Sequence, residues 1–151
     1  MSGRATWTAE ARPLVAGPAN GPVLVLDEPL SMWGGLDPDS GLIIDQRHPQ
    51  RGLDVSAKVL VMPSGRGSSS SSSVLAEALR NGHGPAVIVL GESDPIVVLG
   101  ALVVELLDGA ICPVVVLAPA DYRRLRSGDE MTLDGDGTLS VIPRAGRSPP
   151  R

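Results

Sequence analysis

A run of six serines is the stretch of this sequence best suited to chemistry. It ends the segment SGRGSSSSSS at residues 64–73, directly after an apolar run predicted to be a strand and before a segment predicted to be a helix. At such a junction the backbone N–H groups point outward and meet the positive end of the helix dipole, which favours a bound carboxylate or phosphate. Small side chains let that anion approach the backbone. The segment is therefore a candidate anion-binding loop.

The same segment does not match the common nucleotide-binding loops. No lysine follows the second glycine as in a Walker A loop, and GRGSSS does not fit G-x-G-x-x-G. The alternative to a binding loop is a flexible Ser/Gly linker. The short length and the strongly patterned neighbours favour an ordered loop. A serine hydroxyl needs a charged or hydrogen-bonding neighbourhood to act as a base, and no His, Asp or Glu lies close enough in sequence to be assigned as its partner.

Few other residues stand out for chemistry. His48 and His83 lie in polar segments beside Pro49 and Gly82, and both are expected at the surface. Trp33, beside two glycines, is interpreted as a packing anchor. The only cysteine, Cys112, allows no internal disulfide, and a zinc or iron–sulfur site usually needs three or four ligands. We therefore expect no metal site in this chain alone, and a reducing, cytoplasmic location.

Composition limits the class of protein. The chain has 151 residues, of which 42% are hydrophobic and 20% charged, in the range of one globular domain. The 18 glycines and 14 prolines predict a turn-rich fold and disfavour a coiled coil. A formal net charge of -4 argues against a nucleic-acid partner, although a small anionic substrate can still bind locally. No apolar run approaches the roughly 18 to 20 residues that span a bilayer, so no membrane partner is expected.

The elements that must position the serine run follow from apolar periodicity. Residues 74–82 predict a helix that ends at Asn81-Gly82, with Ser72 or Ser73 as a candidate N-cap. A buried helix is predicted over residues 95–107. Apolar β-branched runs predict four strands, and they lie at residues 23–27, 58–63, 86–90 and 113–117. Two successive βαβ units result, which implies a mainly parallel sheet with right-handed crossovers.

The remaining segments are a hairpin, a short strand candidate and two tails. Residues 130–142 predict a hairpin around 134–137, and 42–45 are a further strand candidate. Residues 1–12 and 144–151 are polar and lack periodicity, so both are expected to be flexible tails. The predicted domain is then residues 13–143.

Five segments in order resemble the swivel domain, or small subunit, of the aconitase X family. They are LDEPLSMWGGLDPDSGLIID at 26–45, HPQRG at 48–52, KVLVMPSGRGSSSSSSVLAEAL at 58–79, DPIVVLGALVVELL at 94–107 and PVVVL at 113–117. The resemblance covers roughly residues 21 to 118, most of the chain. It is specific, because LS-x-WGG followed by MPSGRGSS is much rarer than a generic glycine motif.

The resemblance implies both a fold and an activity. The fold is an α/β swivelling β/β/α domain with a barrel-like β core and flanking helices. It closes over a large catalytic subunit that holds an iron or iron–sulfur centre, and none is bound by this chain alone. Family members dehydrate cis-3-hydroxy-L-proline in bacteria or mevalonate 5-phosphate in archaea. We expect the first activity, with the second as the alternative. A non-catalytic binding module with the swivel fold is the alternative of another class.

The resemblance also implies site residues. In the wider aconitase superfamily the first serine of a GSSR loop is the catalytic base, and that position matches Ser68. The arginine of GSSR corresponds to Ser70 here, which argues against a tricarboxylate substrate. Arg66 is the only cation in the loop, and it faces either the substrate or the solvent and partner. The implied substrate-binding residues are Arg66, Gly67, Ser69 and Ser70, and the implied closure or interface residues are Ser31, Trp33, Gly34 and Gly35.

Overall fold

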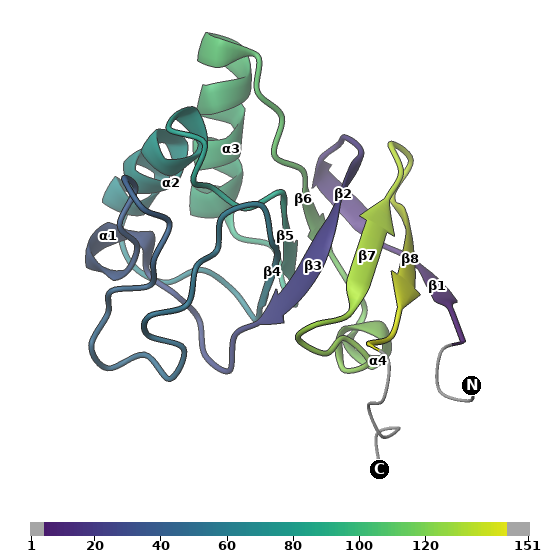
Figure 1. Ribbon diagram of the computed structural model, residues 1–151. Coiled ribbons are helices and arrows are strands. Elements are labelled where there is room, and N and C mark those ends of the chain that lie inside the picture. The colour runs from purple at the N-terminus through teal and green to yellow at the C-terminus, as the bar shows by residue number, and fades with distance from the viewer. Residues whose placement is uncertain (1–4, 145–151) are drawn as a thin grey trace.

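The computed structural model describes residues 5–144, which form one eight-stranded sheet with flanking helices (Figure 1). The sheet order is β1-β8-β7-β3-β4-β5-β6-β2. The strands are β1 (Trp7–Glu10), β2 (Arg12–Val15), β3 (Ala19–Val25), β4 (Val59–Met62), β5 (Val87–Leu90), β6 (Val114–Val116), β7 (Glu130–Leu133) and β8 (Thr138–Ile142). The helices are α1 (Met32–Gly35), α2 (Ser70–Arg80), α3 (Pro95–Asp108) and α4 (Pro119–Tyr122).

The middle of the sheet is a parallel α/β unit. Strands β3, β4, β5 and β6 pair in parallel, and α2 and α3 are the crossovers that connect β4 to β5 and β5 to β6. Every residue of β4 and β5 is buried, as expected for parallel strands covered on both faces. Leu60 and Met62 pack in the core beneath the helices, whereas Val59 and Val61 pack in a second core that includes side chains of β7 and β8. The two predicted βαβ units are confirmed.

The outer strands bend this sheet into an almost closed barrel. Strands β7 and β8 form the predicted antiparallel hairpin, and β1 extends it on one side while β2 pairs with β6 on the other. Although β1 and β2 lie at opposite ends of the sheet order, only Ala11 separates them in the chain. Its N–H donates to the carbonyl of Gly137 at 2.9 Å. One continuous segment therefore links the two sheet edges, and the expected barrel-like core is confirmed.

This closure corrects two expectations. Residues 7–12, predicted to belong to a flexible tail, form β1 and the start of β2. Across residues 5–144 the sheet has three parallel and four antiparallel strand pairs, so it is not mainly parallel. Both errors have one cause: β1 and β2 have four residues each and are stabilised by pairing with β8 and β6, whose paired residues are at least 99 positions away in the sequence. Trp7 adds a contact, because the Arg124 guanidinium lies 4.1 Å from its ring centroid.

Three further elements differ from the prediction. Residues 42–45 form isolated bridges and no strand. Helix α3 is only half-buried, since Leu106 and Leu107 on its outer side are 83% and 72% exposed. Helix α2 begins at Ser70, four residues before the predicted start, and its N-cap Ser69 makes no side-chain capping bond. Ser72 and Ser73 are thus inside the helix and are not its N-cap.

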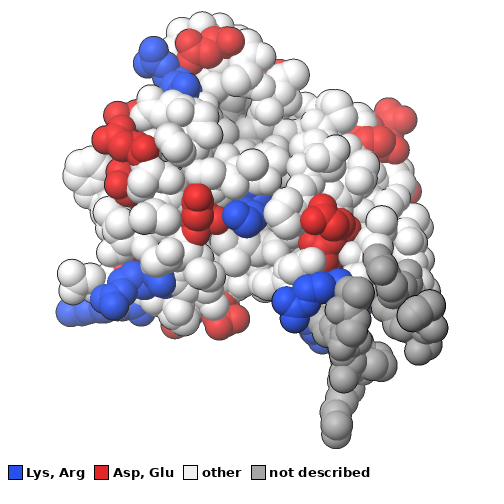
Figure 2. Space-filling view, viewed as in Figure 1, with Lys and Arg blue, Asp and Glu red and all other residues white. Residues whose placement is uncertain are grey.

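The chain ends and the surface complete the description. The backbone N–H of Arg144 donates to Asp129 Oδ1 at 3.0 Å, so this residue of the expected C-terminal tail is held. Residues 1–4 and 145–151 of the two expected tails lie outside the described residues. On the face shown in Figure 2, acidic and basic side chains lie in small scattered groups. Within residues 5–144, no helix has the length and apolar character needed to cross a membrane.

Candidate active site

The serine loop, defined here as residues 64–70, lies where the parallel strands end. It leaves β4 after Met62 and enters α2, and the N-terminus of α3 starts beside it at Asp94. Parallel α/β sheets place their ligand sites outside the carboxyl ends of the strands, where helix N-termini converge. The loop is thus in the position that the sequence predicted for an anion site.

The LSMWGG segment, residues 30–35, returns to this same edge. Leu30 forms a parallel bridge with Gly65. The backbone N–H of Trp33 donates to Ser71 Oγ at 3.2 Å, and the Ser31 and Ser71 hydroxyl oxygens lie 3.4 Å apart. Parts of two of the five segments that carry the family resemblance therefore lie side by side in the structure, although they are well separated in the sequence.

The two glycines of this segment build a tight turn. Trp33 has φ −67° and ψ 117°, and Gly34 has φ 75° and ψ −8°, which are the angles of a type II turn. The positive φ at the second corner favours glycine. A Cβ added at Gly35 would lie 3.0 Å from Leu30 Cδ1, so the segment packs closely on itself. The turn presents Trp33 outward.

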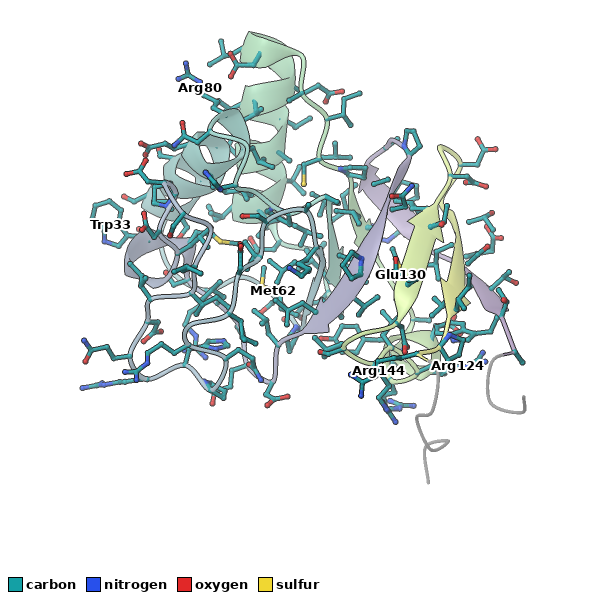
Figure 3. The ribbon with its side chains drawn as sticks, viewed as in Figure 1. Trp33, Met62, Arg80, Arg124, Glu130 and Arg144 are labelled. Carbon is teal, nitrogen blue, oxygen red and sulfur yellow. The ribbon has the colours of Figure 1, made fainter. Side chains whose placement is uncertain are left out.

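Trp33 is not a packing anchor. Its side chain is 64% exposed, and in Figure 3 the indole points away from the body of the molecule. An exposed tryptophan on a rigid turn is typical of a residue that contacts a partner, because it supplies a large apolar surface at low entropic cost. The structure thus leaves this side chain available for the interface role that the resemblance implies.

A small pocket of about 90 Å³ lies between the two segments. Gly65 and Gly67 are needed for its shape: an added Cβ would lie 2.6 Å from Asp94 Oδ2 at the first and 2.6 Å from Ser31 Oγ at the second, where φ is also +101°. The glycines therefore admit close approach of neighbouring side chains as well as of a ligand. The lining residues are Leu30, Met32, Gly65, Arg66, Gly67, Ser71, Asp94, Ile96 and Val97.

The six serines occupy different environments. Ser68, Ser69 and Ser70 are exposed at the start of α2, while Ser71 and Ser72 are buried. The hydroxyl of Ser68 accepts the N–H of Ser70 at 3.3 Å, and within residues 5–144 it bonds to no acidic or imidazole side chain. Ser68 is therefore accessible, but any group that activates it must come from elsewhere in the assembled site.

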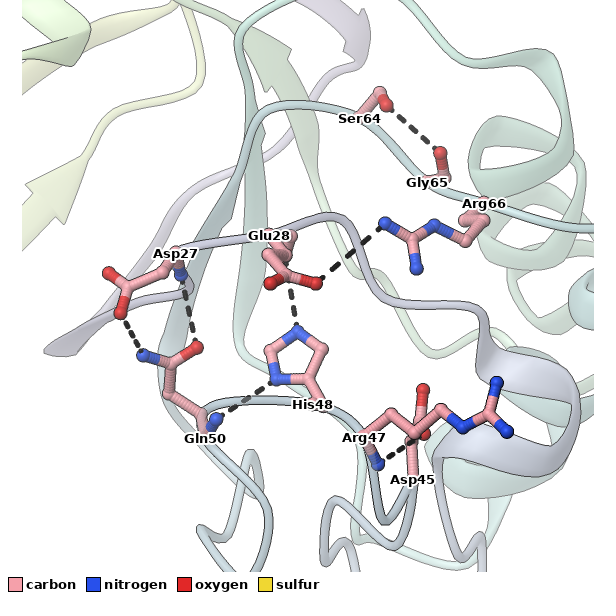
Figure 4. Close-up of polar contacts among 9 residues, drawn as sticks. All are labelled: Asp27, Glu28, Asp45, Arg47, His48, Gln50, Ser64, Gly65 and Arg66. Atoms are coloured by element: carbon pink, nitrogen blue, oxygen red, sulfur yellow. Dashed lines mark hydrogen bonds and ion pairs between the residues drawn. The ribbon is translucent and has the colours of Figure 1, made fainter.

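The Arg66 side chain extends towards Glu28. Its guanidinium lies 4.0 Å from Glu28 Oε1, and both side chains are about half exposed, so the ion pair is weak (Figure 4). The backbone carbonyl of Arg66 faces Ser71 Oγ, at 3.4 Å. Because Arg66 is half exposed and also lines the small pocket, its implied contact with the substrate stays a prediction.

His48 corrects a further expectation. It is only 5% exposed, not a surface residue, and its Nδ1 accepts the backbone N–H of Gln50 at 3.0 Å. The proton therefore resides on Nε2, which donates to the carbonyl of Glu28 at 3.2 Å (Figure 4). This imidazole holds the chain just before the LSMWGG segment. His83 is half-buried and contributes its carbonyl to the Ser56 hydroxyl at 3.1 Å.

The donor set within residues 5–144 does not fit an iron–sulfur centre. No group of three or more His, Cys, Asp or Glu side chains is placed there to hold a metal ion. Cys112 is 2% exposed and its thiol is directed at the carbonyl of Pro85, 3.5 Å away. Burial raises the pKa of this thiol to about 12, which disfavours the thiolate that a metal requires.

Two residues of the site were missed by the sequence reasoning. Asp94 was expected only at a helix N-terminus, and its Oδ1 does accept the N–H groups of Ile96 and Val97 at 2.9 and 3.3 Å. Its other oxygen lies close to Gly65, and this contact depends on the order of the strands in the sheet. Ser71 was assigned no role from the sequence, and only the return of the LSMWGG segment distinguishes it.

Known proteins resemble this chain over nearly its whole length. A family model described as the aconitase X swivel domain matches residues 8–141. The cis-3-hydroxy-L-proline dehydratase of Pseudomonas aeruginosa is 46% identical over 140 residues, and that of Hypocrea jecorina is 40% identical over 128. The matches cover 87% and 85% of this chain but only 24% and 21% of those relatives.

Shorter relatives match end to end. The phosphomevalonate dehydratase small subunit of Methanosarcina acetivorans is 32% identical, with 91% of this chain and 92% of that protein covered. The crystal structure of aconitase X from Thermococcus kodakaraensis in its holo-form superposes with a TM-score of 0.80 at 31% identity, covering 91% of this chain and 99% of that one. The resemblance of the five segments is thereby confirmed, and the chain belongs to the aconitase X swivel-domain family.

Proposed function

We propose that this chain is the small, swivelling subunit of an aconitase X hydro-lyase and acts with a large catalytic subunit. One observation carries the proposal: the LSMWGG segment and the serine loop meet at the carboxyl edge of the parallel strands. Ser68 lies in this loop and is exposed to solvent. The names of the relatives support it, since both groups are dehydratases.

The size of the relatives and the apolar surface of α3 support a large partner. The chain spans about a quarter or less of the two hydroxyproline dehydratases, so most of such an enzyme has no counterpart here. The exposed apolar surface lies on the outer side of α3 and the segment that follows it, and comprises Leu99, Leu102, Leu106, Leu107 and Ile111. Exposed apolar patches are typical of interaction sites.

In the proposed reaction Ser68 is the base. It takes the proton from the carbon next to the substrate carboxylate, the hydroxyl on the adjacent carbon leaves as hydroxide, and a carbon–carbon double bond forms between the two carbons. The abstracted proton and the hydroxide together make up the water that is lost. For cis-3-hydroxy-L-proline the resulting enamine tautomerises to a pyrroline-2-carboxylate. The loop N–H groups suit the substrate carboxylate, assisted by Gly67, Ser69 and Ser70. We place the iron or iron–sulfur centre in the large subunit, because the described residues here offer no ligand set.

We favour cis-3-hydroxy-L-proline as the substrate. The relatives with that activity in their names are 46% and 40% identical over 140 and 128 residues. The phosphomevalonate dehydratase small subunit of Methanosarcina acetivorans is 32% identical over 139 residues, and that of Methanothermobacter thermautotrophicus is 42% identical over only 93 residues. Ser70, at the position of the arginine in GSSR, suits a substrate with fewer carboxylates than citrate. Mevalonate 5-phosphate is the second candidate, since an anion-suited loop also serves a phosphate.

Co-expression with the large subunit from the same genome tests the proposal. We expect the two chains to co-purify and the complex to dehydrate cis-3-hydroxy-L-proline, while this chain alone is inactive. If the complex turned over only mevalonate 5-phosphate, that compound would be the substrate instead. Failure to co-purify, together with no turnover of either compound, would contradict the proposal and favour a non-catalytic binding module.

A further inference from the structure

Ser71 occupies a singular place among the serines. It is 4% exposed, and its Oγ lies between the LSMWGG segment and the serine loop. The hydroxyl accepts the backbone N–H of Trp33 at 3.2 Å and donates to the backbone carbonyl of Arg66 at 3.4 Å. It therefore joins the two segments through their backbones, whose positions do not depend on flexible side chains.

The Ser71 hydroxyl lies between the backbones of Trp33 and Arg66. The Trp33 peptide is held twice, because the Ser31 hydroxyl donates to its carbonyl at 3.1 Å. Its indole nevertheless remains exposed for contact with another surface. On the other side, Arg66 precedes Ser68 by two residues in the same loop. A displacement of Trp33 is thus transmitted through one buried hydroxyl to the backbone that carries Ser68.

Burial of Ser71 makes loss of its hydroxyl costly, because the Trp33 N–H and the Arg66 carbonyl would then lose this partner. Gly67 strengthens the contact, since only a residue without a Cβ lets Ser31 and Ser71 approach the loop so closely. Ser72, by contrast, donates to the carbonyl of Ser69 at 2.6 Å, a bond within its own helix that joins no second segment.

We propose that Ser71 is a positioning residue that couples contact of Trp33 with the large subunit to the placement of Ser68. This inference rests on the proposed function. It assigns the LSMWGG segment two linked roles, docking through the indole and bracing of the serine loop through the backbone. Ser71 itself touches neither substrate nor reacting atoms.

The first test compares Ser71→Ala with Ser73→Ala in the reconstituted complex. Both serines lie in the first turns of α2, but only Ser73 is exposed and without a bond to the LSMWGG segment. We expect Ser71→Ala to lower kcat by about 10-fold to 100-fold with little change in KM, because a small misplacement of a catalytic group has effects of that size. Ser73→Ala should match the wild type. Equal kcat for the two variants would overturn the inference.

A double-mutant cycle tests the coupling itself. Trp33→Ala should weaken binding of the large subunit and lower kcat at saturating partner. If Ser71 transmits the contact, the double variant Trp33→Ala/Ser71→Ala should have nearly the same kcat as Ser71→Ala alone. Effects on kcat that multiply would show two independent roles and contradict the coupling.

A measurement on the full chain alone separates this inference from the proposed function. Amide hydrogen exchange at Trp33 should accelerate in Ser71→Ala and not in Ser73→Ala, because only the first removes the acceptor of that N–H. If the wild-type complex has no dehydratase activity and exchange at Trp33 still accelerates in Ser71→Ala, the proposed function fails while the connection through Ser71 is supported. Unchanged exchange at Trp33 would refute that connection. Ser31→Ala, which frees the carbonyl side of Trp33, provides a second variant should Ser71→Ala not fold.

Discussion

The serine loop and the tip of the β7–β8 hairpin are both Gly-containing turns, yet they are built in opposite ways. At the hairpin tip Asp134 Oδ1 accepts the N–H groups of Asp136 and Thr138 at 2.8 and 3.1 Å, so the turn satisfies its own backbone. In the serine loop the hydroxyls of Ser68 to Ser70 are exposed, and the N-cap Ser69 makes no side-chain bond to the helix. The hairpin turn thus satisfies its own backbone, whereas the serine loop leaves hydroxyls exposed, as the proposed role in ligand binding requires.

The same contrast separates the two halves of the barrel. The antiparallel half, strands β1, β2, β7 and β8, closes the sheet, while the parallel half, strands β3 to β6 with α2 and α3, carries the candidate site at its carboxyl edge. Changes in the antiparallel half should therefore affect stability alone. Changes in the parallel half should affect turnover as well.

The largest stability effect is expected from Leu139→Ala in β8. Leu139 is completely buried in the core that includes side chains of β4 and β7. Its truncation should lower the free energy of unfolding by about 2 to 5 kcal/mol, as for other buried leucines. Urea unfolding measures this loss. Turnover per folded complex should stay at the wild-type value, and a selective loss of kcat would break the proposed division between the halves.

A smaller effect is expected from Gly100→Val, at the contact of α3 with α2. A Cβ at this position would lie 2.9 Å from the carbonyl oxygen of Ser72 and 3.0 Å from Leu75 Cδ2. Overpacking of this kind costs about 1 to 3 kcal/mol. Because α2 also carries Ser71, kcat should fall beyond the loss of folded protein. Gly135→Val, where an added Cβ meets nothing within 4 Å, is the matched control.

Substitutions at Asp94 separate capping from charge. Asp94→Ala removes the N-cap of α3 and should cost about 0.5 to 2 kcal/mol in thermal or urea unfolding. Asp94→Asn keeps a capping oxygen and should retain most of that stability while it removes the carboxylate from the pocket. If both variants are equally destabilised, the capping bonds to Ile96 and Val97 are not the reason.

The smallest effect is a loss of local stability at low pH in the segment between the LSMWGG segment and β4. The backbone N–H of Asp39 and the hydroxyl of Ser40 hold the pKa of Asp37 below 3.8. At Asp54 burial acts to raise the pKa, but the hydroxyl and N–H of Ser56 outweigh it, and the pKa also lies below 3.8.

Both lowered pKa values contribute stability that is present above pH 3.8 and is lost as the pH falls through the folded-state values. The protection of residues 37–56 against amide exchange, measured relative to the intrinsic exchange rate at each pH, should fall in that acid range before the protection of β4 and β5 does. A simultaneous loss of protection in the strands would show that these carboxylates stabilise the whole domain.

The sequence predicted the parallel half and the β7–β8 hairpin well but missed β1 and β2. Runs such as KVLVMP and AVIVL are continuous and β-branched because their strands are buried on both faces, so they are recognisable without partners. β1 and β2 are only partly buried and have no such pattern, and the partners that stabilise them lie at least 99 residues away.

For the site, the motif identified the serine loop and its location at the end of a strand. Three features required tertiary structure: the buried hydroxyl of Ser71, the outward indole of Trp33 and the inward imidazole of His48. The local sequence is polar or glycine-rich in each case, and it predicts a surface position for His48 and a packing anchor at Trp33. The side chain's direction is instead set by a second segment that the sequence does not place.

Turnover of the Ser68→Ala complex tests the central claim most directly. Removal of one exposed hydroxyl leaves the core intact, so assembly with the large subunit should be preserved while the rate falls about 100-fold to 10,000-fold, as for loss of a general base. Ser73→Ala measured beside it should keep the wild-type rate. Wild-type turnover by the Ser68→Ala complex on its true substrate would contradict the assignment of the base, and equal tolerance across Ser68 to Ser73 would show that no hydroxyl of the run takes part in turnover.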